Sequence, residues 1–444
     1  MIRLLDKSRI TWFNYFYIFC IIIYAGRATV FARDLGDIRT FGNAFALLIT
    51  VYFFIINKVQ FTRDYKISIS IFLLYAVVTS INNRIVNPFW ILQWLIWLTI
   101  AYGVCQGLGK RLFVTVETVL LHLSMIALII WVIDLIFPSV VEHLVKFFEF
   151  SKPYTEDGNV AANMIFYTLS SDYGSAAVAD FIIFSKRNPG FAWEPGAFAC
   201  FICLGIYCNI LRNNIKFNNN GALWVFLLAL LSAQSTTGFS TLILMMGVWM
   251  LANRKYGWGL VVVPMAMLIF SLPFVGDKMM MEYESLGTID VDQLHGGALG
   301  RTYSLILDFQ EFLRHPIIGL GGWTEGTLLA QSGNETATIS GIGDLLVRFG
   351  AIMSLVFFIL LVKSCKKIQY DFQSPNSYIL IVVILAMMYS YGLWTTPLYI
   401  ALWMYGVYSP ISKTTQPRVV QLNDNSVMRL NDPVLFDSTI CSRC

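Results

Sequence analysis

The sequence has little charge. Asp, Glu, Lys and Arg make up only 13% of its 444 residues, whereas 57% are hydrophobic and 15% are aromatic. A soluble domain cannot bury that share of apolar surface, so the composition predicts a multi-spanning membrane protein. The net charge of +4 does not indicate nucleic-acid binding, because the basic residues are scattered at the ends of apolar runs.

The sequence also lacks a disulfide framework. It has eight cysteines, but the two long polar segments, 138–194 and 276–341, contain none of them. Cys441 and Cys444 in the tail have no accompanying metal ligands, so neither a disulfide-rich scaffold nor a zinc site is predicted. No cleavable signal peptide is evident, because the first apolar run has no small-residue cleavage site, and we expect this run to be retained.

The apolar runs predict an all-α membrane protein with about twelve transmembrane helices and two long external loops. We expect an N-terminal part with five spans (1–137), a first external loop (138–194) and four further spans (195–275). A second external loop (276–341) and three C-terminal spans (342–412) follow, and the polar tail (413–444) is expected to be disordered. The predicted spans are 12–25, 41–57, 67–81, 88–104, 113–137, 196–211, 222–233, 239–251, 258–275, 342–362, 378–393 and 396–411.

Basic residues indicate the orientation of these spans. Most of the 31 Lys and Arg lie before the first span, in alternate connections between spans, and in the tail. Because basic residues are retained on the cytoplasmic side, both termini are expected in the cytoplasm and both long loops outside.

The pair of spans 222–251 is unusually short. Thirty residues rise about 45 Å, and two full crossings need about 60 Å. The apex S-A-Q-S-T-T-G-F-S (232–240) is therefore expected below the outer membrane surface, lining a polar or protein-filled cavity. A single kinked helix is the alternative, and it would move the second long loop to the cytoplasm.

A chemically distinctive stretch, R-N-P-G-F-A-W-E-P-G (187–196), precedes the sixth span. Gly190 allows a sharp turn, and Pro195 suits the first position of a helix with Glu194 just before it. An arginine and a glutamate are thus held at the mouth of a span. The alternative interpretation is a helix cap with a nearby snorkelling cation.

The second long loop carries a second arginine in a recognisable setting. H-G-G-A-L-G (295–300) precedes Arg301, and Leu305, Phe309 and Phe312 then recur at helical spacing. This spacing predicts a short amphipathic helix at the membrane surface. H-P-I-I-G-L-G-G (315–322) ends that helix.

Together, R-x-x-G-x-x-x-E-P-G, the S-T-T-G hairpin and the G-R to H-P-I-I-G-L-G segment resemble, in this order, the O-antigen polymerase and O-antigen ligase superfamily of bacterial envelope glycosyltransferases. The resemblance covers roughly residues 185–365. It implies a metal-independent, multi-pass enzyme of the bacterial cytoplasmic membrane that transfers a glycan from undecaprenyl diphosphate at the outer face.

The resemblance also implies the site. Two loop arginines would hold the diphosphate, and no metal or other cofactor is expected. The expected substrate-binding residues are Arg187, Arg301, Gly190, Ser235, Thr236, Thr237, Gly319 and Gly321. The expected partners are the undecaprenyl-diphosphate-linked donor and acceptor, membrane lipids, a chain-length regulator and a flippase, without nucleic acid.

The chemistry of the residues agrees with this assignment. Negative charge grows on the leaving diphosphate, and arginine binds phosphate oxygens bidentately while keeping its charge near lipid. Glu194 is the first candidate for a catalytic base and His315 the second, with a plain turn histidine as the alternative for His315. Asp290 and Asp292 are the nearest alternative as a metal site, although a solvated acidic stretch is the simpler interpretation.

Three functions remain open. The favoured one is a polymerase that joins lipid-linked repeat units into O-antigen, capsule or exopolysaccharide, and the second is a ligase that transfers the glycan to lipid A-core. Ligases of the superfamily resemble one another in a His-Asn pair about eleven residues before a Gly, and counting back from Gly350 gives Ile339 and Ser340 instead. The third function, a transporter of lipid-linked oligosaccharide, would favour ionisable residues in the middle of spans and symmetric halves, and the sequence has neither.

Overall fold

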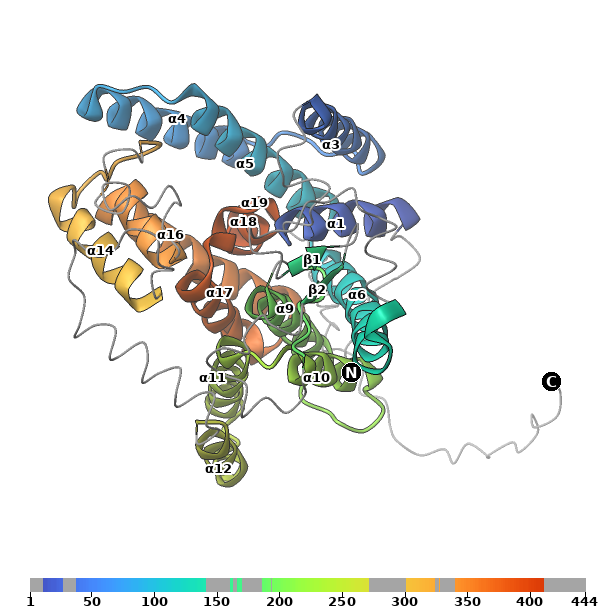
Figure 1. Cartoon of the computed structure of the whole chain (residues 1–444). Helices are drawn as coiled ribbons and strands as arrows, with labels where there is room; N and C mark the ends of the chain where they lie inside the picture. The colour runs from blue at the N-terminus through green and yellow to red at the C-terminus, as the bar shows by residue number, and fades with distance from the viewer. Residues whose placement is uncertain are drawn as a thin grey trace, which may run out of the picture. The chain divides into compact units, whose positions relative to one another are not determined.

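A computed structural model describes residues 11–26, 37–140, 160–162, 166–169, 186–192, 194–270, 301–323, 327 and 340–410. Figure 1 shows these residues as a set of helices with one short strand pair. The predicted tail, 413–444, and most of both predicted external loops lie outside the described ranges. The all-α prediction is confirmed as a fold class for the described residues, except for the short strand pair in the first predicted loop.

Six of the described helices are long and apolar enough to cross a membrane. They contain between 18 and 32 residues, which at about 1.5 Å per residue matches a hydrocarbon layer of about 30 Å. By length and composition the chain is a multi-span membrane protein. The six are α4 (Arg63–Asn83), α5 (Pro88–Leu108), α6 (Arg111–Ile136), α9 (Pro195–Asn213), α11 (Thr236–Asn253) and α16 (Gly341–Phe372).

Other predicted spans correspond to helices that are not among these six: α1 (Trp12–Ala25), α3 (Asp37–Ile56), α10 (Gly221–Ala233), α12 (Gly259–Phe270) and α17 (Ile379–Ser390). The predicted last span, 396–411, is not a single crossing helix. It forms α18 (Pro397–Trp403) and α19 (Tyr405–Tyr408), of seven and four residues, with Met404 between them. These are too short to span a bilayer, and α18 is buried along its whole length.

Short turns of 3-10 helix connect several of these elements: η3 (Tyr256–Trp258), η5 (Pro375–Tyr378) and η6 (Gly392–Thr395). In the first predicted loop, β1 (Val160–Ala162) pairs antiparallel with β2 (Tyr167–Leu169), with Val160 opposite Leu169. Three-residue strands carry too short a pattern for sequence periodicity to detect, which is why the all-helical prediction omitted them.

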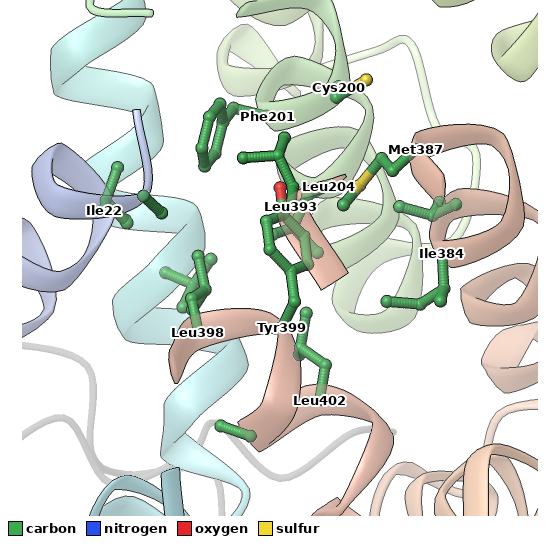
Figure 2. Packing of buried hydrophobic residues seen from close by; sticks show 14 of the residues in the cluster. Ile22, Cys200, Phe201, Leu204, Ile384, Met387, Leu393, Leu398, Tyr399 and Leu402 are labelled. Atoms are coloured by element: carbon green, nitrogen blue, oxygen red, sulfur yellow. The ribbon is translucent and has the colours of Figure 1, made fainter. Parts of the chain in front are cut away.

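Helix α9 lies at the centre of the described packing. Every residue from Pro195 to Leu211 is buried, and α9 contacts α6, α10, α11 and α17. Figure 2 shows Phe201 and Leu204 of α9 packed toward Tyr399 of α18, with Met387 of α17 nearby. Small residues permit this close approach, as a side chain at Gly205 would meet the ring of Phe226 on α10 at 2.6 Å.

Helices α10 and α11 form a hairpin, and not one kinked helix. Asn220, which caps the start of α10, accepts a hydrogen bond from Asn209 of α9 at 3.2 Å. Near the end of α11, Trp249 donates to Asn214, which follows α9, at 2.6 Å. The start of α10 and the end of α11 therefore both lie beside the C-terminal end of α9. Its apex, residues 232–235, is buried in protein, as expected for polar backbone at membrane depth.

Helix α16 is broken at Gly350, whose φ of 64° and ψ of −175° are not helical. The segment after α14 (Arg301–Arg314) fills this break, because Leu320 and Gly321 donate their N–H groups to the carbonyls of Val347 and Arg348, both at 2.8 Å. These hydrogen bonds satisfy the two α16 carbonyls at the break, and they hold the segment after α14 against α16.

Candidate functional site

The turn before α9 is held between α6 and α10. Asn188 donates from its side chain to the Ser232 hydroxyl at 3.0 Å, and its side-chain oxygen accepts from the Gly190 N–H at 2.9 Å. Gly190 has a φ of +58°, and a Cβ there would come within 2.5 Å of the Phe198 ring. Gly190 is therefore required by backbone conformation and packing, and its N–H is already used within the turn.

Arg187 lies at the start of this turn and is half-buried. Its Nε donates to the carbonyl of Ala233 at the end of α10, at 3.3 Å. The neighbouring Lys186 forms an ion pair of 2.9 Å with Asp134 of α6, and its carbonyl accepts from Trp131 at 3.0 Å. These contacts fix the backbone on both sides of Arg187 and orient its guanidinium plane at the apex of the α10–α11 hairpin.

Glu194 stands immediately before α9, as predicted, with Pro195 at the first helical position. Its carboxylate does not cap the helix; it accepts a hydrogen bond from the Tyr391 hydroxyl at 3.0 Å. Gly196 makes room for this contact, because a side chain there would overlap the Tyr391 hydroxyl. The sequence analysis did not identify Tyr391 as a site residue, because aromatic residues near the end of a span are common in this chain.

The residues of the S-T-T-G apex make different contacts. Ser235 caps α11 by accepting from the Gly238 N–H at 3.3 Å and is buried. Thr236 is the first residue of α11 and is half-buried. Thr237 shares a hydrogen bond of 2.9 Å with the hydroxyl of Ser390, at the end of α17. The predicted hairpin residues are thus brought next to Tyr391 through Ser390.

Ser390 and Tyr391 are where three helix N-termini meet. The first turn of α9 packs on the Tyr391 hydroxyl through Gly196, and the first turn of α11 contacts Ser390 through Thr237. The first residue of α16, Gly341, packs on the Tyr391 carbonyl, which a side chain there would approach to 2.7 Å. Helix N-termini carry partial positive charge and unpaired N–H groups, so this end of the described helices favours an anion.

Arg301 is the first residue of α14, and its side chain lies outside what the structure describes. The contacts of α14 with α16 nevertheless show where the backbone of Arg301 lies. The carboxylate of Asp308 packs on Gly343, whereas Pro316 accepts a hydrogen bond from Ala351, so α14 runs parallel to α16. Arg301, about 10 Å before Asp308, then lies beyond the start of α16. Arg301 therefore begins α14 toward the end of α16 where Gly341 packs on the Tyr391 carbonyl, and the Tyr391 hydroxyl contacts Glu194.

His315 is not brought to this site. It follows the last residue of α14, about 20 Å along the helix from Arg301. Its Nε2 lies 4.0 Å from the carboxylate of Glu311. The second candidate for a catalytic base is thus separated from Glu194 and Arg187.

Gly319 and Gly321 have structural roles at the break in α16. Both are buried with positive φ, and a Cβ at Gly319 would lie 2.6 Å from the Arg348 carbonyl. Gly319 donates its N–H to His315 at 3.1 Å and Gly321 donates to Arg348. Because both N–H groups are used within the protein, these glycines do not offer the phosphate contacts that the sequence resemblance implied.

The contact between α14 and α16 contains buried acids that the sequence analysis missed. Ser304, Asp308 and Glu311 recur at helical spacing and face α16, whereas Ile306, Phe309 and Leu313 are exposed. The amphipathic helix was predicted correctly, and its inward face is the polar one. On α16, Asp344 forms an ion pair with Arg348 one turn later.

Asp308 is the most perturbed of these acids. It is 2% exposed, accepts a hydrogen bond from Ser304, and has one carboxylate oxygen without a hydrogen-bond partner. The pKa of Asp308 is raised to about 8, mainly by burial and also by the nearby Asp344 and Glu311, whereas Arg348 and the Ser304 hydrogen bond act to lower it. The carboxyl group is therefore largely protonated at neutral pH.

The chain matches no family model and is significantly similar to no curated protein. The resemblance described above therefore rests on the ordered sequence patterns alone. Within the described ranges, no group of three His, Cys, Asp or Glu side chains is placed to hold a metal ion. Asp290, Asp292, His295 and Ile339 lie outside those ranges.

Proposed function

We propose that the chain is a metal-independent glycosyltransferase that polymerises undecaprenyl-diphosphate-linked repeat units at the outer face of the bacterial cytoplasmic membrane. One observation carries this proposal: Glu194 and the N-termini of α9, α11 and α16 meet around Ser390 and Tyr391, and Arg187 contacts the end of α10 beside the apex from which α11 begins. A diphosphate is both an anion and a leaving group, and this arrangement surrounds it with positive charge.

In the proposed reaction, a hydroxyl oxygen of the acceptor sugar bonds to the anomeric carbon of the donor glycan. The bond from that carbon to the diphosphate breaks, and undecaprenyl diphosphate leaves with the electron pair. Glu194 receives the hydroxyl proton, and the 3.0 Å hydrogen bond from Tyr391 orients its carboxylate. The arginines stabilise the charge that develops on the diphosphate.

The direct test uses purified protein with a defined undecaprenyl-diphosphate-linked repeat unit, with the products separated by size. The wild type should produce a ladder of chains. Arg187→Ala and Arg301→Ala should each lower the rate of chain growth by about 100-fold or more, the size typical of a lost transition-state contact. Arg314→Ala is the matched control, because this exposed arginine lies at the far end of α14. Unchanged growth in Arg187→Ala would refute the role of that residue.

Replacement of Arg187 by Lys should restore activity only partly, because a point charge replaces a bidentate fork. EDTA should leave chain growth intact. A strict requirement for Mg²⁺ would contradict the metal-independent reaction and would return attention to Asp290 and Asp292.

The proposed orientation can be tested separately by labelling single cysteines from outside intact cells. A probe at Asn334→Cys should react and a probe at Asn219→Cys should not, because the two lie in segments assigned to opposite sides. Reaction at Asn219→Cys would place the anion-favouring end on the wrong side for this donor.

A ligase remains the second candidate. It is disfavoured because the positions that carry the His-Asn pair in ligases correspond to Ile339 and Ser340, and the Ser340 hydroxyl is engaged in capping α16 through the Gly343 N–H. Loss of the gene should therefore leave single lipid-linked units or one-unit surface chains. Long lipid-linked polymer without its final acceptor would instead identify a ligase.

A transporter is less well supported. The buried ion pairs found in the described helices lie close to helix ends: Glu117 with Arg212, Asp134 with Lys186, and Lys367 with Asp371. A transport pathway would favour such groups at the middle of the spans.

A further inference from the structure

An apolar cavity of about 290 Å³ lies between α4, α5, α16 and the C-terminal helices. Its wall is aliphatic and aromatic over most of its length. Two charged residues, Asp64 on α4 and Lys363 on α16, also line it. The cavity is thus a hydrocarbon-lined space with two opposite charges, a combination that neither the predicted spans nor the proposed reaction requires.

Aromatic residues line the cavity toward the start of α16. Trp94, Phe349 and Trp394 are buried and form a triangle whose ring centroids are 5.2 to 5.7 Å apart. Edge-to-face contacts of this kind hold rings in fixed positions. The triangle is therefore a rigid part of the cavity wall, and Leu345, one turn before Phe349 on α16, lines the cavity beside it.

The charged residues lie at the other end. From Phe349 to Lys363 the cavity wall follows α16 for about 21 Å, which exceeds the half-thickness of about 15 Å of a hydrocarbon layer. Asp64 and Lys363 are both exposed. This is also the end of the helices opposite Tyr391 and Glu194, because α16 begins beside Tyr391.

We propose that this cavity binds one acyl chain of a zwitterionic phospholipid with a primary ammonium headgroup, such as phosphatidylethanolamine. The phosphate lies at Lys363, the ammonium group lies at Asp64, and the acyl chain extends toward the aromatic triangle. The volume is at the small end for ligand sites and suits one chain. A headgroup with both charges complements the pair, whereas a purely anionic headgroup meets Asp64 without compensation.

This proposal does not depend on the proposed function. The diphosphate of a lipid-linked donor would be at the opposite end of the helices, and its charge is a poor match for a site that includes Asp64. The bound phospholipid is therefore a second lipid with its own headgroup contacts.

The test is native mass spectrometry of the purified full chain with phosphatidylethanolamine, phosphatidylglycerol or undecaprenyl phosphate added. The wild type should bind phosphatidylethanolamine about three- to fivefold more tightly than phosphatidylglycerol, the range expected for an exposed charge contact. Asp64→Asn should remove this preference, and Lys363→Gln should weaken binding of both phospholipids. Lys366→Gln is the matched control, because Lys366 is exposed three residues away and does not line the cavity.

Equal binding of the two phospholipids by the wild type would overturn the proposal, as would undecaprenyl phosphate displacing phosphatidylethanolamine at equal concentration. A second variant tests the cavity itself. Ile71 lines it, and Ile71→Trp should fill part of it and release phosphatidylethanolamine from protein that still elutes as a single species. An unchanged number of bound lipids in this variant would also overturn the proposal.

Discussion

Asp308 should make the docking of α14 onto α16 weaker as the pH rises. Its carboxyl group is buried against Gly343, with Glu311 on its own helix and Asp344 and Arg348 on α16 as its charged neighbours. The pKa of Asp308 is raised from 3.8 to about 8 in the folded protein. Between these two values the unfolded chain binds fewer protons at this residue than the folded chain, so stability falls as pH increases from about 4 to about 8.

The size of this effect follows from the shift. Each pKa unit corresponds to about 1.4 kcal/mol, so the whole rise from 3.8 to about 8 corresponds to about 6 kcal/mol. Most of it is lost by pH 7, and the remainder by about pH 8. Because α14 contacts α16 more than any other described element, we expect the loss to appear first as local opening of α14.

Asp308→Asn removes the titrating group with little change in shape. Its amide oxygen can still accept the hydrogen bond from Ser304. Thermal unfolding in detergent, followed between pH 5 and 9, should show a wild-type midpoint that falls with pH and a variant midpoint that falls less. Asp64→Asn is the control, because Asp64 is exposed and lies on a different helix. The same pH dependence in wild type and Asp308→Asn would refute this reasoning.

Two glycine substitutions test other contacts. Gly350→Ala should destabilise the protein by at least about 2 kcal/mol, because Gly350 has a positive φ and its Cβ would lie 2.5 Å from the Ile317 carbonyl; an unchanged denaturation midpoint would contradict this. Gly196→Ala should displace the Tyr391 hydroxyl and lower chain growth, and Tyr391→Phe in the same chain should recover part of the lost stability by opening space. If the double variant is as unstable as Gly196→Ala alone, then the clash with the Tyr391 hydroxyl is not the cause of the lost stability.

Sequence patterns were sufficient wherever the structure is determined locally. Pro195 at the first helical position and the short helix that follows H-G-G-A-L-G both follow from short-range rules, and the structure confirms them. The short hairpin also follows, since its length alone restricts how deeply its apex lies.

The remaining features depend on contacts between distant parts of the chain. Nothing near Tyr391 in the sequence predicts that it reaches Glu194, nearly two hundred positions earlier. The break at Gly350 is stable only because residues 316–321 satisfy its backbone groups. The orientation of α14 could not be predicted from periodicity either. Periodicity shows that a helix has an apolar and a polar face, but it does not show which face packs against the protein. Near a membrane the apolar face can turn to lipid while the polar face turns inward.

The α14–α16 contact links the stability prediction to the proposed function. Arg301 is the first residue of α14, whereas Arg187 lies in a turn that contacts α6 and α10. If docking of α14 is limited by ionisation of Asp308, then chain growth should decline as the pH rises toward 8, and Asp308→Asn should keep its activity to higher pH. Arg187→Ala should lose activity at every pH, because α6 and α10 do not change with α14. If chain growth by Asp308→Asn declines at alkaline pH as it does in the wild type, then another titrating group, such as the acceptor or its base, causes the decline. The titration of Asp308 would then not control the position of Arg301.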